Sequence, residues 1–265
     1  MEEPQHSSPS IRLTNVTKRY AGDAVALKDV TFHATPGRVL GLLGRNGAGK
    51  TTALRILMGL TKPTAGVAHV LGQPYPDLPR GARRVGTSFD DYGSLVGASG
   101  PRELSILATT LGVPQRRARE VLELVGLSGV GRKPVKAYST GMRRRLNLAI
   151  TLLADPEVVV LDEPANGLDP DGVRWLRDLL GGLAAEGRTV LLSSHLLAEV
   201  EQTVQDVVIL QQSVRYSGSL ADLTRDGTRR LEAAFFDVLA DQPTSDPARH
   251  AEMMDEQRAA ERTGR

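Results

Sequence analysis

Apolar residues follow two patterns along this chain, and each pattern predicts a different kind of element. Between Ile11 and about Ala34, short stretches alternate apolar with polar residues, which is typical of strands that bury one face. The stretches "RVLGLLG", "EVVVLDEP" and "TVLLSSH" instead hold unbroken apolar runs, as expected of parallel strands buried on both faces. Helical spacing of apolar residues follows each of these runs, so we expect an α/β core.

The chain between about 86 and 155 has mainly helical spacing. Three stretches, "SGPRELSILATTLG", "PQRRAREVLELVGL" and "TGMRRRLNLAITLLA", carry apolar residues at that spacing. In the first of them, Ser99 is a possible N-cap and Gly112 marks the exit. We expect a helical subdomain inserted into the α/β core.

Polar sequence predicts little ordered structure at both ends of the chain. Residues 1–10 are expected to be a disordered lead, and residues 241–265, which alternate charges with Pro and Ser, a disordered tail. Before this tail we expect a docking helix within residues 221–240. Its apolar stripe consists of Leu231, Ala234, Phe235, Val238 and Leu239.

Composition excludes several kinds of function. The chain of 265 residues has no cysteine, which excludes disulfides, thiol catalysis and Cys-ligated metal sites. Its 33 basic and 31 acidic residues leave a net charge of +2, so no nucleic-acid partner is expected. No stretch approaches the roughly 18–20 apolar residues of a membrane-spanning helix, and the N-terminus is too polar for a secretory signal. If the protein works at a membrane, another chain must span it.

The stretch "GRNGAGKTT" matches the phosphate-loop pattern G-x-x-x-x-G-K-[ST]. It lies between a predicted buried strand and a predicted helix from Lys50 to about Leu60. Backbone N–H groups can surround a polyphosphate only where no Cβ blocks its approach, and the start of a helix adds a positive dipole end. Lys50 would supply a cation for the outer phosphates, and Thr51 a hydroxyl ligand for Mg²⁺. A flexible glycine-rich turn is the alternative, but the flanking strand and helix favour nucleotide binding. The predicted binding residues of the loop are Gly44, Arg45, Asn46, Gly47, Ala48, Gly49, Lys50, Thr51 and Thr52.

Two adjacent acids, Asp162 and Glu163, end the apolar run of "EVVVLDEP". Because neighbouring residues of a strand point to opposite faces, we expect the two carboxylates to have different roles. Asp162 is expected in the Mg²⁺ shell beside the phosphate loop. Glu163 is expected to act as general base or to position the attacking water. A solvated strand end is the alternative, which the phosphate loop upstream makes less favourable.

These motifs resemble those of the ATP-binding subunit of an ABC transporter, and the resemblance covers about residues 11–220. "YSTGM" (138–142) is similar to the family signature LSGGQ, "NGLDP" (166–170) to the D-loop, and "SSH" (193–195) to the switch-histidine segment. All occur in the family's order. The resemblance implies an α/β P-loop NTPase core with an N-terminal antiparallel β-subdomain and an inserted helical subdomain, binding ATP and Mg²⁺. It also implies a head-to-tail dimer, with each ATP between the phosphate loop of one copy and the signature of the other.

The resemblance assigns roles to further residues, each of which also has a plain structural explanation. His195 would contact the γ-phosphate and orient Glu163 in catalysis, although a lone histidine is more often structural. Tyr20 would stack on adenine, or be an ordinary strand aromatic. Asp169 would link the two sites of the dimer, or only cap a helix.

The signature residues Ser139, Thr140 and Gly141 would bind the ATP held by the other copy. Ser139 can cap the following helix, Gly141 lets backbone approach a ligand, and a helix N-terminus is an anion site. A plain helix cap is the alternative. The next residues, Arg143–Arg145, are interpreted as a solvated helix face.

Three positions depart from the family pattern. Asp90 stands where the family has glutamine, and it only accepts hydrogen bonds when ionised. It could still reach Mg²⁺ or its water, but we expect it to support transport coupling more than ATP binding. Thr140 and Met142 replace the usual Gly and Gln of the signature. The acid and the pattern "YS-x-GM" are both similar to the branch that exports peptide antibiotics and other drugs. An appended regulatory domain is expected to be absent.

The sequence therefore favours an ATP-hydrolysing subunit that powers a membrane exporter. The expected partners are a second copy or a related cassette, and separate transmembrane permease subunits. The expected location is cytoplasmic, peripheral on the inner face of the cell membrane. One alternative is a soluble ABC ATPase acting on translation or DNA, which usually carries two cassettes, coiled-coil insertions or zinc modules. Another is a small-molecule kinase, which has no need of "YSTGM" or "SSH".

Overall fold

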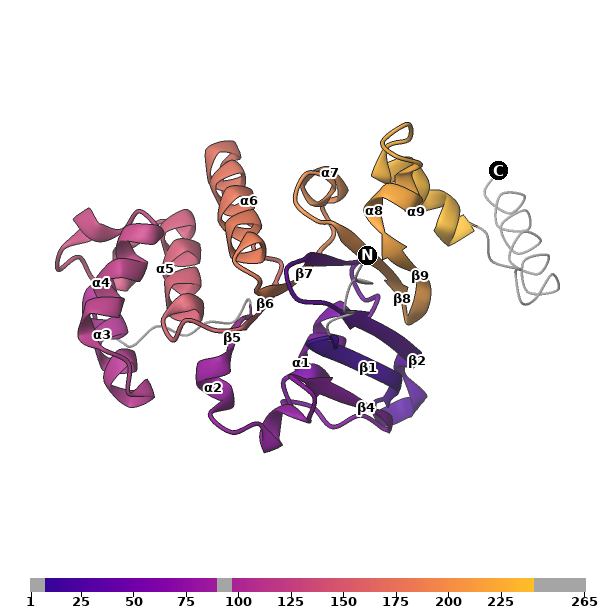
Figure 1. Ribbon diagram of the computed structural model, residues 1–265, viewed down its shortest axis with the longest axis horizontal. Coiled ribbons are helices and arrows are strands. Elements are labelled where there is room, and N and C mark those ends of the chain that lie inside the picture. Colours follow the sequence, from indigo (N-terminus) through magenta and orange to yellow (C-terminus); the bar gives the residue numbers. More distant parts are fainter. Residues whose placement is uncertain (1–7, 90–96, 241–265) are drawn as a thin grey trace, which may run out of the picture.

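The computed structural model describes residues 8–89 and 97–240, which form two sheets and the helices around them (Figure 1). The smaller sheet is antiparallel and has the strand order β2-β1-β4. Its strands are β1 (Ile11–Arg19), β2 (Val25–Ala34) and β4 (Ala65–Val70). Strands β1 and β2 come from the alternating stretches of the sequence, so this sheet is the predicted β-subdomain.

The larger sheet has the order β5-β6-β7-β3-β8-β9, and only β9 is antiparallel to its neighbour. Its strands are β3 (Val39–Leu43), β5 (Val85–Ser88), β6 (Val158–Asp162), β7 (Thr189–Ser194), β8 (Asp206–Gln211) and β9 (Ser213–Ser219). Every residue of β3, β6 and β7 is buried, as their unbroken apolar runs predict. Because these strands are parallel, their carboxyl ends meet at one edge of the sheet.

Helices flank the larger sheet and extend the molecule beyond it (Figure 1). They are α1 (Lys50–Leu57), α2 (Gly81–Arg84), α3 (Gly100–Leu111), α4 (Gln115–Leu124), α5 (Thr140–Leu152), α6 (Pro170–Ala185), α7 (Leu197–Glu201), α8 (Leu220–Thr224) and α9 (Leu231–Ala240). Short 3-10 turns lie at Ala21–Asp23, Tyr75–Asp77, Ser128–Val130 and Val135–Ala137.

The side chains of the larger sheet alternate between two cores. Leu40 and Leu42 of β3 pack with apolar residues of α1 and the β-subdomain. Val39 and Leu43 of the same strand belong to the other core, with α6, α9 and the helical subdomain. Burial on both sides fixes β3 and its neighbours firmly, and so fixes the edge from which the site is built.

The two ends of the molecule are helical. Helices α3, α4 and α5 gather beyond β5 (Figure 1) and bury residues such as Leu104 and Leu146 between them. At the other end, α9 packs against α7 and α8 and buries Leu231, Ala234 and Phe235 of the predicted apolar stripe. The predicted segment 221–240 thus holds most of α8 and all of α9.

The predicted fold class is confirmed, with one helix shorter than expected. Helix α1 ends at Leu57 and not near Leu60. Gly59 takes a left-handed backbone (φ 67°), and the N–H of Leu60 bonds to the carbonyl of Arg55, which closes the helix. Within residues 8–89 and 97–240, no helix has the length and apolar content to cross a membrane.

Candidate nucleotide-binding site

A cavity of about 580 Å³ lies at the carboxyl edge of β3, β6 and β7. Open α/β sheets usually bind ligands at such an edge, and the volume suits a small molecule. Most of the cavity lining comes from the β3–α1 loop with the start of α1, the end of β6 with the residue after it, and the residue after β7. Ala26, Phe89 and Asn166 also line the cavity. The predicted residues in this lining are Arg45, Asn46, Gly47, Ala48, Gly49, Lys50, Thr51, Thr52, Asp162, Glu163 and His195.

Glycine lets the β3–α1 loop pass close to its neighbours. At Gly49, where φ is 101°, an added Cβ would lie 2.5 Å from the carbonyl oxygen of Ala26. At Gly44 an added Cβ would lie 2.5 Å from the carbonyl oxygen of Leu210. Helix α1 begins directly after this loop, so the free N–H groups of its first turn are available to an anion.

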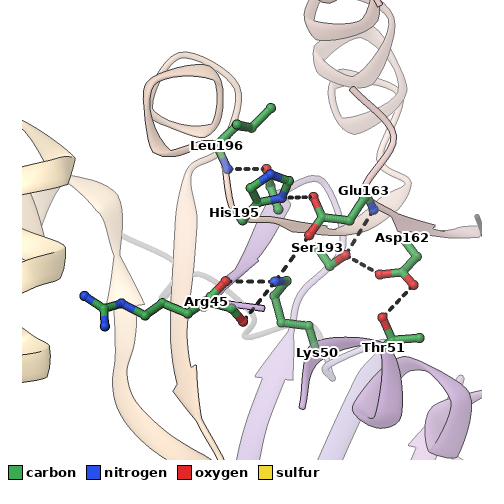
Figure 2. Close-up of polar contacts among 10 residues, drawn as sticks. Arg45, Lys50, Thr51, Asp162, Glu163, Ser193, His195 and Leu196 are labelled. Carbon is green, nitrogen blue, oxygen red and sulfur yellow. Dashed lines mark hydrogen bonds and ion pairs between the residues drawn. The ribbon is translucent and has the colours of Figure 1, made fainter. Parts of the chain in front are cut away.

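Lys50 is held across the cavity by oxygen atoms. Its side chain is only 6% exposed, and its Nζ donates to the carbonyl of Gly44 at 2.8 Å. The same Nζ lies 3.2 Å from Oε1 of Glu163 (Figure 2). The side chain of Arg45 points away from this group in Figure 2, with its guanidinium carbon 5.8 Å from the ring centre of Phe236. Arg45 therefore offers the cavity its main chain.

Asp162 lies between two hydroxyl groups. Its Oδ2 accepts from Thr51 Oγ1 at 2.8 Å, and its Oδ1 accepts from Ser193 Oγ at 2.5 Å. A carboxylate beside a hydroxyl is a hard oxygen donor set of the kind that Mg²⁺ prefers. Ser193 was not predicted as a site residue, although it belongs to the "SSH" segment.

The carboxylate of Glu163 contacts partners different from those of the Asp162 carboxylate, but strand alternation is not the cause. Strand β6 ends at Asp162, and Glu163 has a left-handed backbone with φ 48°. The N–H of Glu163 donates to Ser193 Oγ at 3.1 Å, and its carboxylate Oε2 lies 2.9 Å from Nδ1 of His195. The expected separation of the two acids is present, but the reason given for it from the sequence was wrong. A turn at the strand end separates them.

The signature and D-loop residues lie elsewhere in the chain. Ser139, Thr140, Gly141 and Asp169 are absent from the lining of this cavity in the same chain. Two of the three predicted caps form through the side chain: Ser139 Oγ accepts from the N–H of Met142 at 3.2 Å, and Asp169 Oδ1 from that of Gly172 at 2.8 Å. Ser99 is at the N-cap position of α3, but its side chain makes no capping hydrogen bond.

Tyr20 also lies outside the cavity lining, and Asp90 falls outside the described residues. Tyr20 follows β1, is 47% exposed, and has Lys18 Nζ 4.9 Å from its ring centre. The stacking of Tyr20 on adenine and the role of Asp90 near Mg²⁺ and in transport coupling therefore stay predictions.

The interpretation of Arg143–Arg145 as a solvated face was wrong for two of the three arginines. Arg143 is exposed, but Arg144 and Arg145 are half-buried. Nε of Arg144 donates to the carbonyl of Asn166 at 3.1 Å. Arg145 donates to the carbonyl of Val125 and lies over the ring of Trp175. Both contacts join segments far apart in sequence, so helical periodicity alone could not have revealed them.

Glu199, on α7, adds a half-buried acid beside the site. Burial raises the pKa of its carboxyl above the ordinary value, with His195 lowering it in part and Glu163 raising it further. Its Oε2 is buried without a hydrogen-bond partner in the described part of the chain. The pKa of Glu199 therefore depends mainly on its burial and also on the charges of Glu163 and His195.

Comparison with known proteins agrees with this geometry. A family model described as "ABC transporter" matches residues 27–166. The bacitracin transport ATP-binding protein BcrA of Bacillus licheniformis is 39% identical over 208 residues, 77% of this chain and 68% of the relative. The lantibiotic transport ATP-binding protein SrtF of Streptococcus pyogenes is 34% identical over 226 residues, 85% of this chain and 95% of the relative.

Among solved structures, one titled "Structure of ATP binding subunit of ABC transporter" superposes with a TM-score of 0.78 at 26% identity. The match covers 86% of this chain and 99% of that chain. BcrA and SrtF confirm the likeness of this chain to ATP-binding subunits that work in the transport of peptide antibiotics. The family model and the relatives agree with the geometry of the site. The chain therefore belongs to the ABC transporter family, as one of its ATP-binding subunits.

Proposed function

We propose that this chain binds and hydrolyses ATP to power a membrane exporter of peptide antibiotics or other drugs. The observation that carries the proposal is the contact of Glu163 with both Lys50 and His195 at the phosphate loop. These contacts support the proposal because they put a carboxylate next to the loop at which we propose that the terminal phosphate of ATP binds.

Each group at the cavity has a role in this proposal. The loop N–H groups bind the phosphate chain, and Lys50 exchanges its carbonyl partners for phosphate oxygens. Glu163 accepts the proton of the attacking water, and His195 orients the Glu163 carboxylate. Tyr20 stacks on the adenine ring.

Thr51 and Asp162 would hold Mg²⁺, and Asp90 would bind this ion or its water. When bound, this ion neutralises charge on the β- and γ-phosphate oxygens. Thr51 and Asp162 already contact each other at 2.8 Å, so both oxygens are in position to serve one cation.

A second cassette, of the same or a related chain, completes the site. The signature residues Ser139–Gly141 do not line the cavity of their own chain, so a partner supplies them head to tail. ATP binding closes this dimer and hydrolysis opens it, which moves separate transmembrane subunits. The chain then works on the cytoplasmic face of a membrane.

Export of peptide antibiotics or drugs is supported by two independent features. The relatives BcrA and SrtF are named for bacitracin and lantibiotic transport. The acid at 90 and the signature "YSTGM" both resemble the exporting branch. A role in translation or on DNA has no comparable support.

The variant Glu163→Gln tests the proposal. The amide cannot accept the proton of water, so steady-state hydrolysis by the purified chain should fall roughly 10²- to 10⁴-fold. ATP affinity, measured by calorimetry, should stay within about 3-fold, because the loop is intact. Glu123→Gln, on the exposed face of α4, is the matched control and should hydrolyse at the wild-type rate. Hydrolysis by Glu163→Gln within a few-fold of wild type would show that another group activates water.

A further inference from the structure

Arg144 joins the helical subdomain to the turn that carries Glu163. Arg144 lies in the second turn of α5, and its Nε donates to the carbonyl of Asn166 at 3.1 Å. The N–H of Asn166 donates to the carbonyl of Glu163 at 3.3 Å. Two consecutive hydrogen bonds therefore lead from α5 to the main chain of Glu163.

A packing contact supports the same connection. Gly167 has a left-handed backbone, and a Cβ added there would lie 2.8 Å from Cγ2 of Thr140. The start of α5 therefore packs closely against the residue after Asn166. Since Asn166 itself lines the cavity, a shift of α5 would move a residue of the site.

The neighbouring arginine anchors α5 on the other side. Nη1 of Arg145 donates to the carbonyl of Val125, at the end of α4, at 3.2 Å. Its guanidinium lies 4.2 Å from the ring centre of Trp175 on α6. Because α5 is tied to both α4 and α6, Arg144 projects from a fixed support.

We propose that Arg144 is a positioning residue for ATP hydrolysis, which holds the Glu163 turn from the helical subdomain. The inference rests on the proposed role of Glu163 in activating water. The charged guanidinium donor is stronger than a neutral one, and it fixes a carbonyl that is one hydrogen bond away from Glu163. The position of α5 thereby sets the position of the catalytic carboxylate.

Arg144→Met tests this inference, because Met keeps an unbranched side chain and removes the donor. Displacing a catalytic group by a fraction of an ångström lowers the rate steeply, so kcat should fall roughly 5- to 50-fold. KM for ATP should change less than about 2-fold, because Lys50 and the loop are untouched. Arg143→Met, the exposed neighbour, is the control and should keep the wild-type kcat. Arg144→Lys, which restores a charged donor, should recover part of the rate.

A double variant separates positioning from a general structural effect. If Arg144 acts through Glu163, then Arg144→Met should change single-turnover hydrolysis less than 2-fold in the Glu163→Gln background. An equal loss in both backgrounds would overturn the inference, as would a wild-type kcat for Arg144→Met. Wild-type hydrolysis by Glu163→Gln alone would instead overturn the proposed function. Melting temperatures of all variants within about 3 °C would confirm that each one is folded.

Discussion

Ser193 connects the carboxylate of Asp162 to the main chain of Glu163. Its hydroxyl donates to Asp162 and accepts from the N–H of Glu163. Asp162 and Ser193 are direct partners in the register of β6 and β7, so the sheet sets this contact. The hydroxyl keeps Asp162 turned toward Thr51 and ties the Glu163 turn to the sheet.

Ser193→Ala should weaken the Mg²⁺ site without removing a predicted ligand. Groups behind a metal ligand typically contribute about 10-fold to metal affinity or rate. We expect the Mg²⁺ concentration for half-maximal hydrolysis to rise by about that factor. Thr189→Val, at the other end of β7, is the control and should leave it unchanged. An unaltered Mg²⁺ dependence in Ser193→Ala would show that Thr51 alone orients Asp162.

Local spacing was sufficient to predict most residues of the cavity. Lys50 and Thr51 follow from one contiguous motif, and Glu163 from its place after a buried strand. Ser193 and Arg144 were missed because their contacts depend on strand register and on the packing of α5, which a one-dimensional pattern does not contain.

Among the elements, buried strands were the most predictable. A short unbroken apolar run is typical of a strand buried on both faces, and β3, β6 and β7 are buried at every residue. Helix ends were less predictable, as α1 shows by ending at Leu57, two residues before the left-handed Gly59. Helix α5 shows a further limit, because its polar residues contact other elements of the protein and not only water.

The short helix α7 carries a group that opposes folding at neutral pH. Because the pKa of the Glu199 carboxyl is raised mainly by burial, the folded chain binds its proton more tightly than the unfolded chain. The destabilisation is absent below the ordinary pKa of 4.5 and grows as pH rises through the folded-state pKa. It is complete above that pKa.

Glu199→Gln should therefore stabilise the protein in a pH-dependent way. Removing a buried charge with an unpaired oxygen should contribute about 1 kcal/mol, which corresponds to about 2–4 °C in melting temperature at pH 7–8. The gain should disappear near pH 4, where Glu199 is protonated in both states. Thermal unfolding between pH 4 and 8 measures this, with the exposed Glu123→Gln as control. A gain that is equal at all pH values would assign the effect to packing.

At the scale of the whole molecule, the cavity of one copy lacks the signature residues, which is the basis for the proposed shared ATP site. The phosphate loop and the two carboxylates lie together, while the signature at the start of α5 contributes nothing to the same cavity. Gly141 has open space around it, since an added Cβ would meet nothing nearer than Leu168 Cδ2 at 4.0 Å. A larger residue there would leave its own chain intact and obstruct only a ligand or a partner.

Gly141→Glu, combined with Glu163→Gln, uses this open space to test the dimer. The combined variant should fold and bind ATP with unchanged affinity, because its own phosphate loop is intact. It should remain a single copy at saturating Mg-ATP, since the carboxylate would repel the nucleotide of the partner. Dimerisation of this variant as strong as that of Glu163→Gln would exclude the signature from the interface.

The most direct test is the mass in solution of Glu163→Gln at saturating Mg-ATP, measured by light scattering after size exclusion. Blocking hydrolysis should trap the closed form, so we predict twice the chain mass of 28.5 kDa, with one ATP retained per chain. Without nucleotide the mass should return to that of one chain. A mass of 28.5 kDa under full ATP occupancy would contradict an ATP site shared between two copies.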